Sequence, residues 1–250
     1  VLILGTGGTS KTVFAAASDC GASKIRFVSR SGELNYENVY ENAADAEIIV
    51  NTTPIGMFPD IYRKPLSLKN FKNLCGVLDV IYNPLRTELI TEALSLGLNA
   101  GGGLYMLAAQ GVRAGEIFTS KNFGSGKIDE IYETLLRDTE NIVLTGMPGC
   151  GKSTFAKIIA KKTGKHLVDT DAEVVKSEGM NIPDIFSKFG EEYFRNAETA
   201  AIKKAAAGHS LIIATGGGAV LREENMKALS QNGHIYYIDR STDLLASDGR

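Results

Sequence analysis

The sequence has few cysteines, no long apolar run and no leader pattern, and each absence excludes a class of protein. Its three cysteines, Cys20, Cys75 and Cys150, are widely spaced among 250 residues, which favours reduced thiols over a disulfide framework. No apolar run approaches the roughly 20 residues that a membrane-spanning helix needs. Because no basic, apolar, small-residue leader is visible, we expect a cytoplasmic protein.

Basic clusters and metal-ligand spacings are also missing. The 27 Lys and Arg residues are balanced by 29 Asp and Glu residues, and the net charge is -2. Nonspecific binding to nucleic acid or to a membrane surface needs clustered basic side chains, so we expect neither partner. His166, His209 and His234 show no metal-ligand spacing, so we expect them to be structural or exposed. The sequence does not indicate an oligomeric state.

One segment in the second half of the chain has the pattern of a phosphate-binding loop. Residues 146–153 match G-x-x-x-x-G-K-[ST], between an apolar run at 142–145 and a stretch with helical spacing at 154–162. Lys152 would reach the outer phosphates of ATP, and the Ser153 hydroxyl would bind Mg²⁺. The expected ATP-binding residues are Gly146, Gly149, Gly151, Lys152, Ser153 and Thr154. For Cys150, inside this loop, a small spacer role is favoured over a modifiable thiol.

The first residues have the pattern of a dinucleotide-binding unit. An apolar strand at 1–4 runs into Gly5-Thr-Gly-Gly-Thr-Ser10, and a helical stretch follows, with Ser10 in place of the third glycine. About twenty residues further on, Arg30 lies between Ser29 and Ser31, where an NAD enzyme has an acidic residue. A guanidinium suits the 2′-phosphate of NADP, so NADP is favoured over NAD. The alternative, an ordinary solvated arginine after a strand, stays open.

Strands and helices alternate along the first half. Short apolar runs at 24–28, 46–50 and 76–81 predict further strands, and helices are expected at 104–118 and 128–136. This alternation predicts an α/β fold with a doubly wound parallel sheet. Ligand-facing residues should follow strand ends, at 51–57, 82–86 and 101–106. Two nucleotide loops about 140 residues apart favour two domains, which we place at 1–138 and 139–250.

The motifs of the first half resemble the NADP-binding domain of shikimate dehydrogenase. They are Gly5-x-Gly-Gly, Ser29-Arg30-Ser31, Asn51-Thr-Thr-Pro-Ile-Gly-Met57, Asp79-Val-Ile-Tyr-Asn-Pro84 and Gly103-x-x-Met106-x-x-x-Gln110, within residues 1 to about 137. The resemblance implies a Rossmann-type sheet and NADPH-dependent reduction of 3-dehydroshikimate to shikimate. It implies an NADP site made of Gly5, Gly7, Gly8, Ser29, Arg30, Thr53, Met57 and Gly103. Tyr82 and Gln110 would face shikimate, although a helix-surface glutamine would look the same.

The family's catalytic lysine and aspartate belong to a substrate domain that precedes this one. The first cofactor-domain strand here begins at residue 1, so we assign no catalytic residue to this half. We expect the reduction to be slow or absent on this chain, because substrate positioning and proton transfer supply most of the acceleration.

The motifs of the second half resemble shikimate kinase from about residue 141 to 250. They are the loop 146–153, Asp169-Thr-Asp171, Phe189-Gly-Glu-Glu-Tyr-Phe-Arg195-x-x-Glu198 and Thr215-Gly-Gly-Gly218. The resemblance implies a P-loop domain of the nucleoside-monophosphate-kinase-like type that phosphorylates shikimate with ATP and Mg²⁺.

The kinase resemblance also implies roles for single residues. Asp169 would serve Mg²⁺ through water, and Asp171 would accept a proton from the attacking hydroxyl or orient it. Arg195 would clamp the shikimate carboxylate, with Glu198 fixing the guanidinium. Gly216, Gly217 and Gly218 would let backbone N–H groups approach the substrate. We also expect Asp169 and Asp171 to point to opposite faces if the strand that precedes Asp169 continues.

The chain is expected to be a fragment of a bifunctional enzyme. Family kinases continue through an arginine-bearing lid, and Arg250 would be its first arginine. Loss of the lid should lower kcat more than nucleotide binding. Two alternatives stay open. One is another substrate, such as quinate, a small alcohol or a nucleoside monophosphate. The other is a noncatalytic nucleotide sensor or scaffold.

Overall fold

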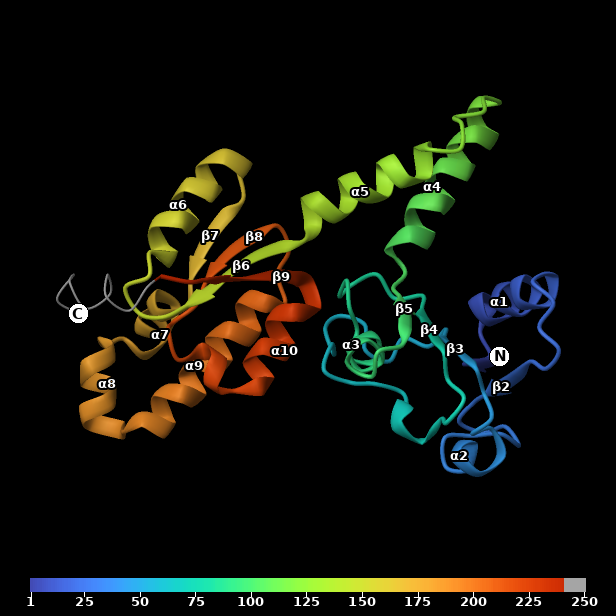
Figure 1. Ribbon diagram of the computed structural model, residues 1–250, viewed down its shortest axis with the longest axis horizontal. Helices are drawn as coiled ribbons and strands as arrows, with labels where there is room; N and C mark the ends of the chain where they lie inside the picture. The colour runs from blue at the N-terminus through green and yellow to red at the C-terminus, as the bar shows by residue number, and fades with distance from the viewer. Residues whose placement is uncertain (241–250) are drawn as a thin grey trace. The chain divides into compact units, whose positions relative to one another are not determined.

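The computed structural model describes residues 1–240 and divides the chain into two compact units, 1–136 and 137–250. Each unit is built on its own parallel sheet (Figure 1), which confirms the predicted α/β class. The domain bounds 1–138 and 139–250 remain a prediction. The expectation for Arg250 falls outside the described residues.

The first unit has a five-stranded sheet with the order β2-β1-β3-β4-β5. Its strands are β1 (Leu2–Leu4), β2 (Arg26–Val28), β3 (Ile48–Asn51), β4 (Gly76–Asp79) and β5 (Asn99–Gly101). Its helices are α1 (Gly8–Asp19), α2 (Val39–Asn42), η1 (Leu68–Asn70), α3 (Glu88–Ser95) and α4 (Leu104–Thr119), and α5 (Lys127–Thr139) runs on into the second unit. The order reverses between β1 and β3, so this sheet has the switch point at which doubly wound folds bind ligands.

The core of the first unit lies on one face of its sheet. Leu2 and Leu4 of β1 pack with Leu89 and Ile90 of α3, because alternate strand residues point to the same face. On the other face Leu78 is 52% exposed, and a concavity of about 560 Å³ lies beside α1. None of the residues predicted to bind a nucleotide or substrate lines this concavity.

The second unit has a four-stranded sheet with the order β7-β8-β6-β9. Its strands are β6 (Asn141–Gly146), β7 (His166–Asp169), β8 (Leu211–Ala214) and β9 (Gly233–Ile238). Its helices are α6 (Lys152–Thr163), α7 (Thr170–Glu178), α8 (Ile182–Phe189), α9 (Glu191–Ala206), η2 (Ala219–Leu221) and α10 (Glu223–Asn232).

Helices cover both faces of this second sheet (Figure 1). On one face Val143 of β6 packs with Ile202 of α9 and Leu229 of α10. On the other face Leu144 of β6 packs with Ala156 of α6. The carboxyl ends of β6, β7 and β8 therefore share one edge between two helical layers, where the predicted kinase motifs begin.

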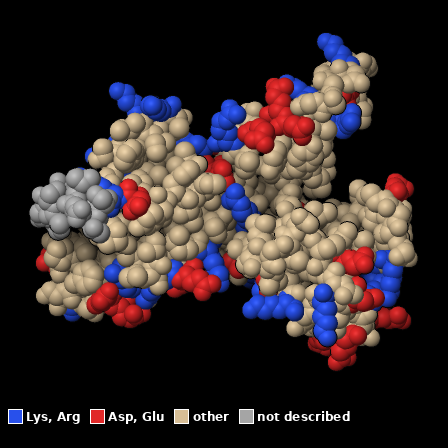
Figure 2. All heavy atoms as spheres, viewed as in Figure 1, with Lys and Arg blue, Asp and Glu red and all other residues tan. Residues whose placement is uncertain are grey.

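On the face drawn in Figure 2, basic and acidic side chains are interspersed on both units. Within residues 1–240, no helix is both long enough and apolar enough to cross a membrane.

Candidate functional site

The predicted phosphate-binding loop connects β6 to α6. Its glycines Gly146, Gly149 and Gly151 have φ values of 150°, 79° and 102°, a region that residues with side chains rarely adopt. The backbone conformation of the loop therefore favours glycine at these three positions. Ser153 and Thr154 are exposed in the first turn of α6, where free N–H groups attract phosphate.

Lys152 is folded over the loop that precedes it. Its Nζ atom donates to the carbonyl oxygens of Gly146 at 2.8 Å and Met147 at 2.9 Å, and the residue is 9% exposed. Cys150 is also buried, and its Sγ atom lies 3.9 Å from the same Nζ. The ammonium group is thus already held at the loop, where it can exchange carbonyl partners for phosphate oxygens.

The structure corrects the strand argument for Asp169 and Asp171. The strand does not continue: β7 ends at Asp169, and α7 begins at Thr170. A carboxylate at a helix N-cap satisfies free N–H groups, and Asp169 Oδ1 accepts from the amides of Asp171 at 3.0 Å and Ala172 at 3.3 Å. The expectation of opposite faces was wrong for a second reason, because residues two apart on a continued strand would share one face. The two side chains differ because Asp169 caps the helix and Asp171 lies in its first turn.

Asp171, Arg195 and the three glycines come together in space. A Cβ atom on Gly216 would overlap Asp171 Oδ1 and lie 2.8 Å from Glu198 Oε1, and one on Gly218 would overlap the Arg195 guanidinium. Gly218 has a φ of -89°, which any residue adopts, so the close approach of the guanidinium requires glycine there. Residues from α7, α9 and the turn after β8 thus form one polar cluster.

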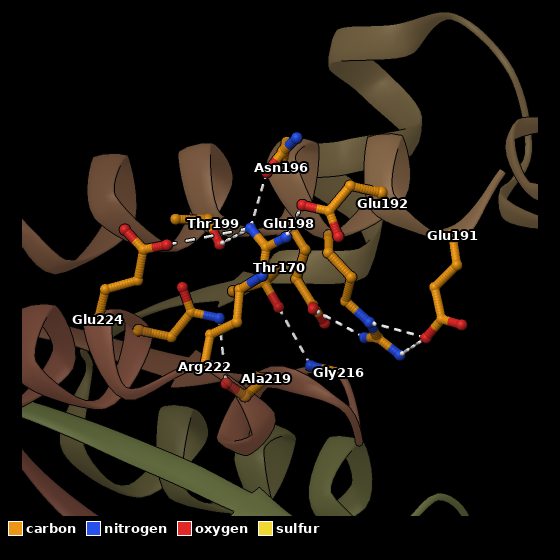
Figure 3. Close-up of polar contacts among 12 residues, drawn as sticks. Thr170, Glu191, Glu192, Asn196, Glu198, Thr199, Gly216, Ala219, Arg222 and Glu224 are labelled. Carbon is orange, nitrogen blue, oxygen red and sulfur yellow. Dashed lines mark hydrogen bonds and ion pairs between the residues drawn. The ribbon is translucent and has the colours of Figure 1, made fainter. Parts of the chain in front are cut away.

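The phosphate loop borders this cluster. A Cβ atom on Gly217 would lie 2.7 Å from the side chain of Pro148 in the loop. The guanidinium of Arg195 donates to Glu198 Oε2 at 2.9 Å, as the spacing of the two residues predicts. Figure 3 shows Glu198 and Thr170 beside Gly216, whose amide donates to Thr170 Oγ1 at 3.2 Å. A site for a donor nucleotide and a site for a small anionic acceptor can therefore lie side by side.

Charges around the cluster act on Asp171 and Arg195 in defined directions. Burial raises the pKa of Asp171, the carboxylates of Asp169 and Glu198 raise it further, and Lys152 and Arg195 oppose this shift. Burial acts to lower the pKa of Arg195, but its bonds to Glu198 and Glu191 outweigh that effect and raise it. Arg195 thus stays a fixed positive charge beside a carboxyl group that is easier to protonate than usual.

In the first unit, the glycine turn lies at the switch point between β1 and β3. Gly5 has a φ of 102°, and a Cβ atom there would lie 2.9 Å from Thr52 Oγ1 beyond β3. Ser10, which replaces the third glycine, is buried in α1 and donates to the Gly7 carbonyl at 2.6 Å. Gly7 caps the helix and Gly8 begins it. The predicted phosphate-binding turn is therefore formed at a helix N-terminus.

The other predicted cofactor residues follow strand ends. Ser29 and Arg30 lie just after β2. Burial raises the pKa of nearby Tyr36, and the positive charge of Arg30 opposes this shift. Thr53 follows β3 and donates its hydroxyl to Asn51 Oδ1 at 2.7 Å. Gly103 is packed so closely that a Cβ atom would overlap the Val80 carbonyl.

The remaining predicted dehydrogenase residues are accessible. Met57 and Tyr82 are 46% and 50% exposed, and Gln110 is exposed on α4.

Sequence reasoning gave no role to a buried polar network in this unit. Asp79, at the end of β4, accepts from Asn51 Nδ2 at 3.1 Å, the Ile81 amide at 3.0 Å and Thr87 Oγ1 at 2.8 Å. Burial raises the pKa of Asp79 to about 6, although these three hydrogen bonds lower it. The network joins the loops after β3 and β4. The sequence did carry a signal for this network, because Asn51 and Asp79 are polar residues at the ends of two apolar strands.

Comparison with known proteins shows what most of the second unit is similar to. The family model for shikimate kinase matches residues 148–248. The shikimate kinase of Caldicellulosiruptor bescii is 48% identical over 99 residues, which cover 40% of this chain and 58% of the relative. That of Thermodesulfovibrio yellowstonii is 46% identical over 106 residues, covering 42% and 61%. The chain thus spans about three fifths of the length of these curated relatives.

A second similarity covers a stretch of the chain about as long as the first unit. A chorismate mutase/shikimate 5-dehydrogenase fusion protein from Clostridium acetobutylicum superposes with a TM-score of 0.50 and 31% identity, covering 54% of this chain and 51% of that one. Together the comparisons confirm the recognition of a shikimate dehydrogenase-type unit joined to a shikimate kinase-type unit.

Proposed function

Because residues 148–248 match the shikimate kinase family, we propose that the second unit transfers the γ-phosphoryl group of ATP to the 3-hydroxyl of shikimate. The observation that carries this proposal is the cluster of Asp171, Arg195 and Gly216–Gly218 beside the phosphate loop. A guanidinium next to carboxylate and backbone donors suits a small hydroxylated acid, whereas a phosphate loop alone specifies only the phosphoryl donor.

Each residue then has a role in the transfer. The backbone of Gly146, Gly149 and Gly151, with Ser153 and Thr154, binds the ATP phosphates, and Lys152 neutralises charge on the transferred group. Arg195 pairs with the shikimate carboxylate, and the amides of Gly216, Gly217 and Gly218 approach the ring. Asp171 orients the attacking hydroxyl and accepts its proton as the new O–P bond forms and the bond to ADP breaks.

Mg²⁺ belongs to this proposal, and the oxygen donors present fit it. The Ser153 hydroxyl is exposed at the start of α6, and Asp169 ends β7 at the same sheet edge. Both offer the hard oxygen atoms that Mg²⁺ prefers, so these two residues would hold the ion beside the ATP phosphates. When bound, the ion neutralises charge on the β- and γ-phosphates.

For the first unit we propose that it binds NADP and is the cofactor-binding part of an enzyme for the NADPH-dependent reduction of 3-dehydroshikimate to shikimate. The glycine turn of Gly5, Gly7 and Gly8 supports the pyrophosphate site, and Ser29 and Arg30 after β2 support recognition of a 2′-phosphate. Thr53, Met57 and Gly103 complete the cofactor site, and Tyr82 and Gln110 face the substrate. Three free cysteines agree with the cytoplasmic location that we also propose.

The kinase proposal is tested with a panel of acceptors. The purified chain is incubated with Mg²⁺-ATP and shikimate, quinate or AMP, and ADP formation is followed together with the phosphorylated product by mass spectrometry. We expect phosphorylation of shikimate and its loss in Asp171→Asn, with Asp184→Asn on α8 as the control. Phosphorylation of AMP but not shikimate would overturn the assignment, and ligand binding without turnover would support a nucleotide sensor.

A further inference from the structure

One arginine, Arg222, ties the segment that follows the three glycines to α9. Its Nη2 atom donates to Glu192 Oε1 at 2.6 Å, and its Nη1 atom donates to Asn196 Oδ1 at 2.8 Å and Thr199 Oγ1 at 3.3 Å. Figure 3 shows the Arg222 side chain reaching these residues. The side chain is only 21% exposed, and its donors engage three side chains of one helix.

The same helix carries the proposed shikimate clamp. Glu192, Asn196 and Thr199 follow at intervals of four and three residues, so they form one face of α9. Arg195 directly precedes Asn196, and Glu198 directly precedes Thr199, so this pair lies on the adjoining face of the helix. Two guanidinium groups, one from α9 and one from the segment after the glycines, therefore meet neighbouring faces of a single helix.

The segment from Gly216 to Arg222, called the glycine segment below, is also held by hydrogen bonds at its start and in its middle. The Gly216 amide donates to Thr170 at the start of α7, and Asn225 Nδ2 donates to the Ala219 carbonyl at 3.0 Å. Arg222 holds the far end of the segment against α9. Of these attachments, the one made by Arg222 joins the segment directly to the helix that carries Arg195.

We propose that Arg222 is a positioning residue. It sets the distance between Gly216–Gly218 and the Arg195–Glu198 pair, and thereby the affinity for the acceptor substrate. This inference rests on the proposed kinase function. Gly218 already lies against the Arg195 guanidinium with no room for a methyl group, so the turn has little freedom to shift. A displacement of about 1 Å in a preorganised site can cost on the order of a hundredfold.

The effect is expected in acceptor binding and not in nucleotide binding. The phosphate loop is anchored by β6 and by the contacts of Lys152 with Gly146 and Met147, and none of these contacts involves Arg222. An exposed surface ion pair contributes little to stability and would not distinguish one substrate from the other. A loss of affinity for shikimate without a loss of affinity for ATP therefore separates a positioning role from a structural one.

The test compares Arg222→Ala, Arg222→Lys and Lys203→Ala with the unmutated chain. Lys203→Ala is the matched control, because Lys203 is a second basic residue of this region that pairs across two elements, joining α9 to Glu224 of α10 at 2.6 Å. Calorimetry measures the affinity for shikimate and for Mg²⁺-ATP, steady-state kinetics give KM for shikimate and kcat, and thermal unfolding gives Tm.

We expect Arg222→Ala to weaken shikimate binding about tenfold or more, to raise KM for shikimate correspondingly, and to leave ATP affinity within about twofold. Arg222→Lys should recover part of the affinity, because an ammonium group keeps one of these contacts but not the fork. Lys203→Ala should bind both ligands as the unmutated chain does.

Each outcome is decisive. Unchanged shikimate affinity in Arg222→Ala, or an equal loss for shikimate and ATP, would overturn the inference and leave the proposed function intact. No shikimate binding by the unmutated chain would overturn the proposed function itself. If Arg222→Ala does not fold, the double variant Glu192→Gln/Asn196→Ala removes the helix partners instead, and the same selective loss is expected.

Discussion

Arg195 and Glu198 lie one turn apart on α9, with Nη1 of the guanidinium 2.9 Å from Oε2 of the carboxylate. Glu198 is 1% exposed, so the ion pair with Arg195 offsets the cost of taking its carboxylate out of water. Its Oε1 atom has no hydrogen-bond partner within residues 1–240 and lies beside Gly216. The pair thus presents a guanidinium and a buried acceptor atom at the glycine turn.

Arg195→Ala should weaken shikimate binding about ten- to a hundredfold, because a charge-assisted bidentate contact is worth roughly 1.5 to 3 kcal/mol. It should also destabilise the unit, because the buried Glu198 carboxylate loses its cation. The double variant Arg195→Ala/Glu198→Gln separates the two effects, since it should recover stability without recovering affinity. Calorimetry and urea unfolding measure them, and unchanged shikimate affinity in the single variant would contradict the clamp.

Lys152→Ala should abolish measurable Mg²⁺-ATP binding. The ammonium group of Lys152 lies within hydrogen-bond distance of the loop carbonyls of Gly146 and Met147, where it is positioned to meet the outer phosphates. Lys157→Ala, an exposed lysine on the same helix, is the control and should bind normally. Calorimetric titration with ATP in the presence of Mg²⁺ makes the comparison, and equal affinity in the two variants would refute the loop assignment.

Asp79 should make the first unit less stable as pH rises from about 4 to about 6. Its pKa is about 6 in the folded chain, mainly because of burial, and about 3.9 in an unfolded one, so the folded state holds the extra proton in this range. The contribution is fully present below the unfolded pKa and is lost as pH passes through the folded one. Its size is on the order of 2 to 3 kcal/mol.

Urea unfolding of Asp79→Asn and of the unmutated chain at several pH values measures this contribution. The amide cannot ionise, so the difference in unfolding free energy between the two proteins should change with pH between 4 and 6 and level off outside that range. A difference that is independent of pH would show that Asp79 has an ordinary pKa.

The unmutated chain should bind NADPH more tightly than NADH, and Arg30→Ala should reduce that preference. The exposed guanidinium after β2 can pair with a 2′-phosphate, which NADH lacks. Arg63→Ala is the control, because Arg63 is an exposed arginine paired with Asp60 on a loop of the same unit. Fluorescence titration of both nucleotides gives the ratio of affinities, and equal affinities in the unmutated chain would remove the basis for an NADP site.

The two glycine turns and the alternation of strands and helices could be predicted from the sequence alone. The predicted strands at 1–4, 24–28, 46–50 and 76–81 correspond to β1 to β4, and the helix expected at 104–118 is α4. These features depend on local rules, namely apolar periodicity and glycine at positive φ, which neighbouring residues reveal. The contact of Arg195 with Glu198 could be predicted for the same reason, since one helical turn fixes it.

Which residues far apart in sequence come into contact could be seen only in the folded chain. The order β7-β8-β6-β9 brings the turn after β8 beside α7 and the phosphate loop, so Gly216 reaches Asp171 and Gly217 reaches Pro148. Helix capping ended β7 at Asp169, which strand periodicity could not indicate. The raised pKa of Asp79 and the hold of Arg222 on α9 likewise arise from burial and from packing between segments far apart in sequence, which local patterns do not encode.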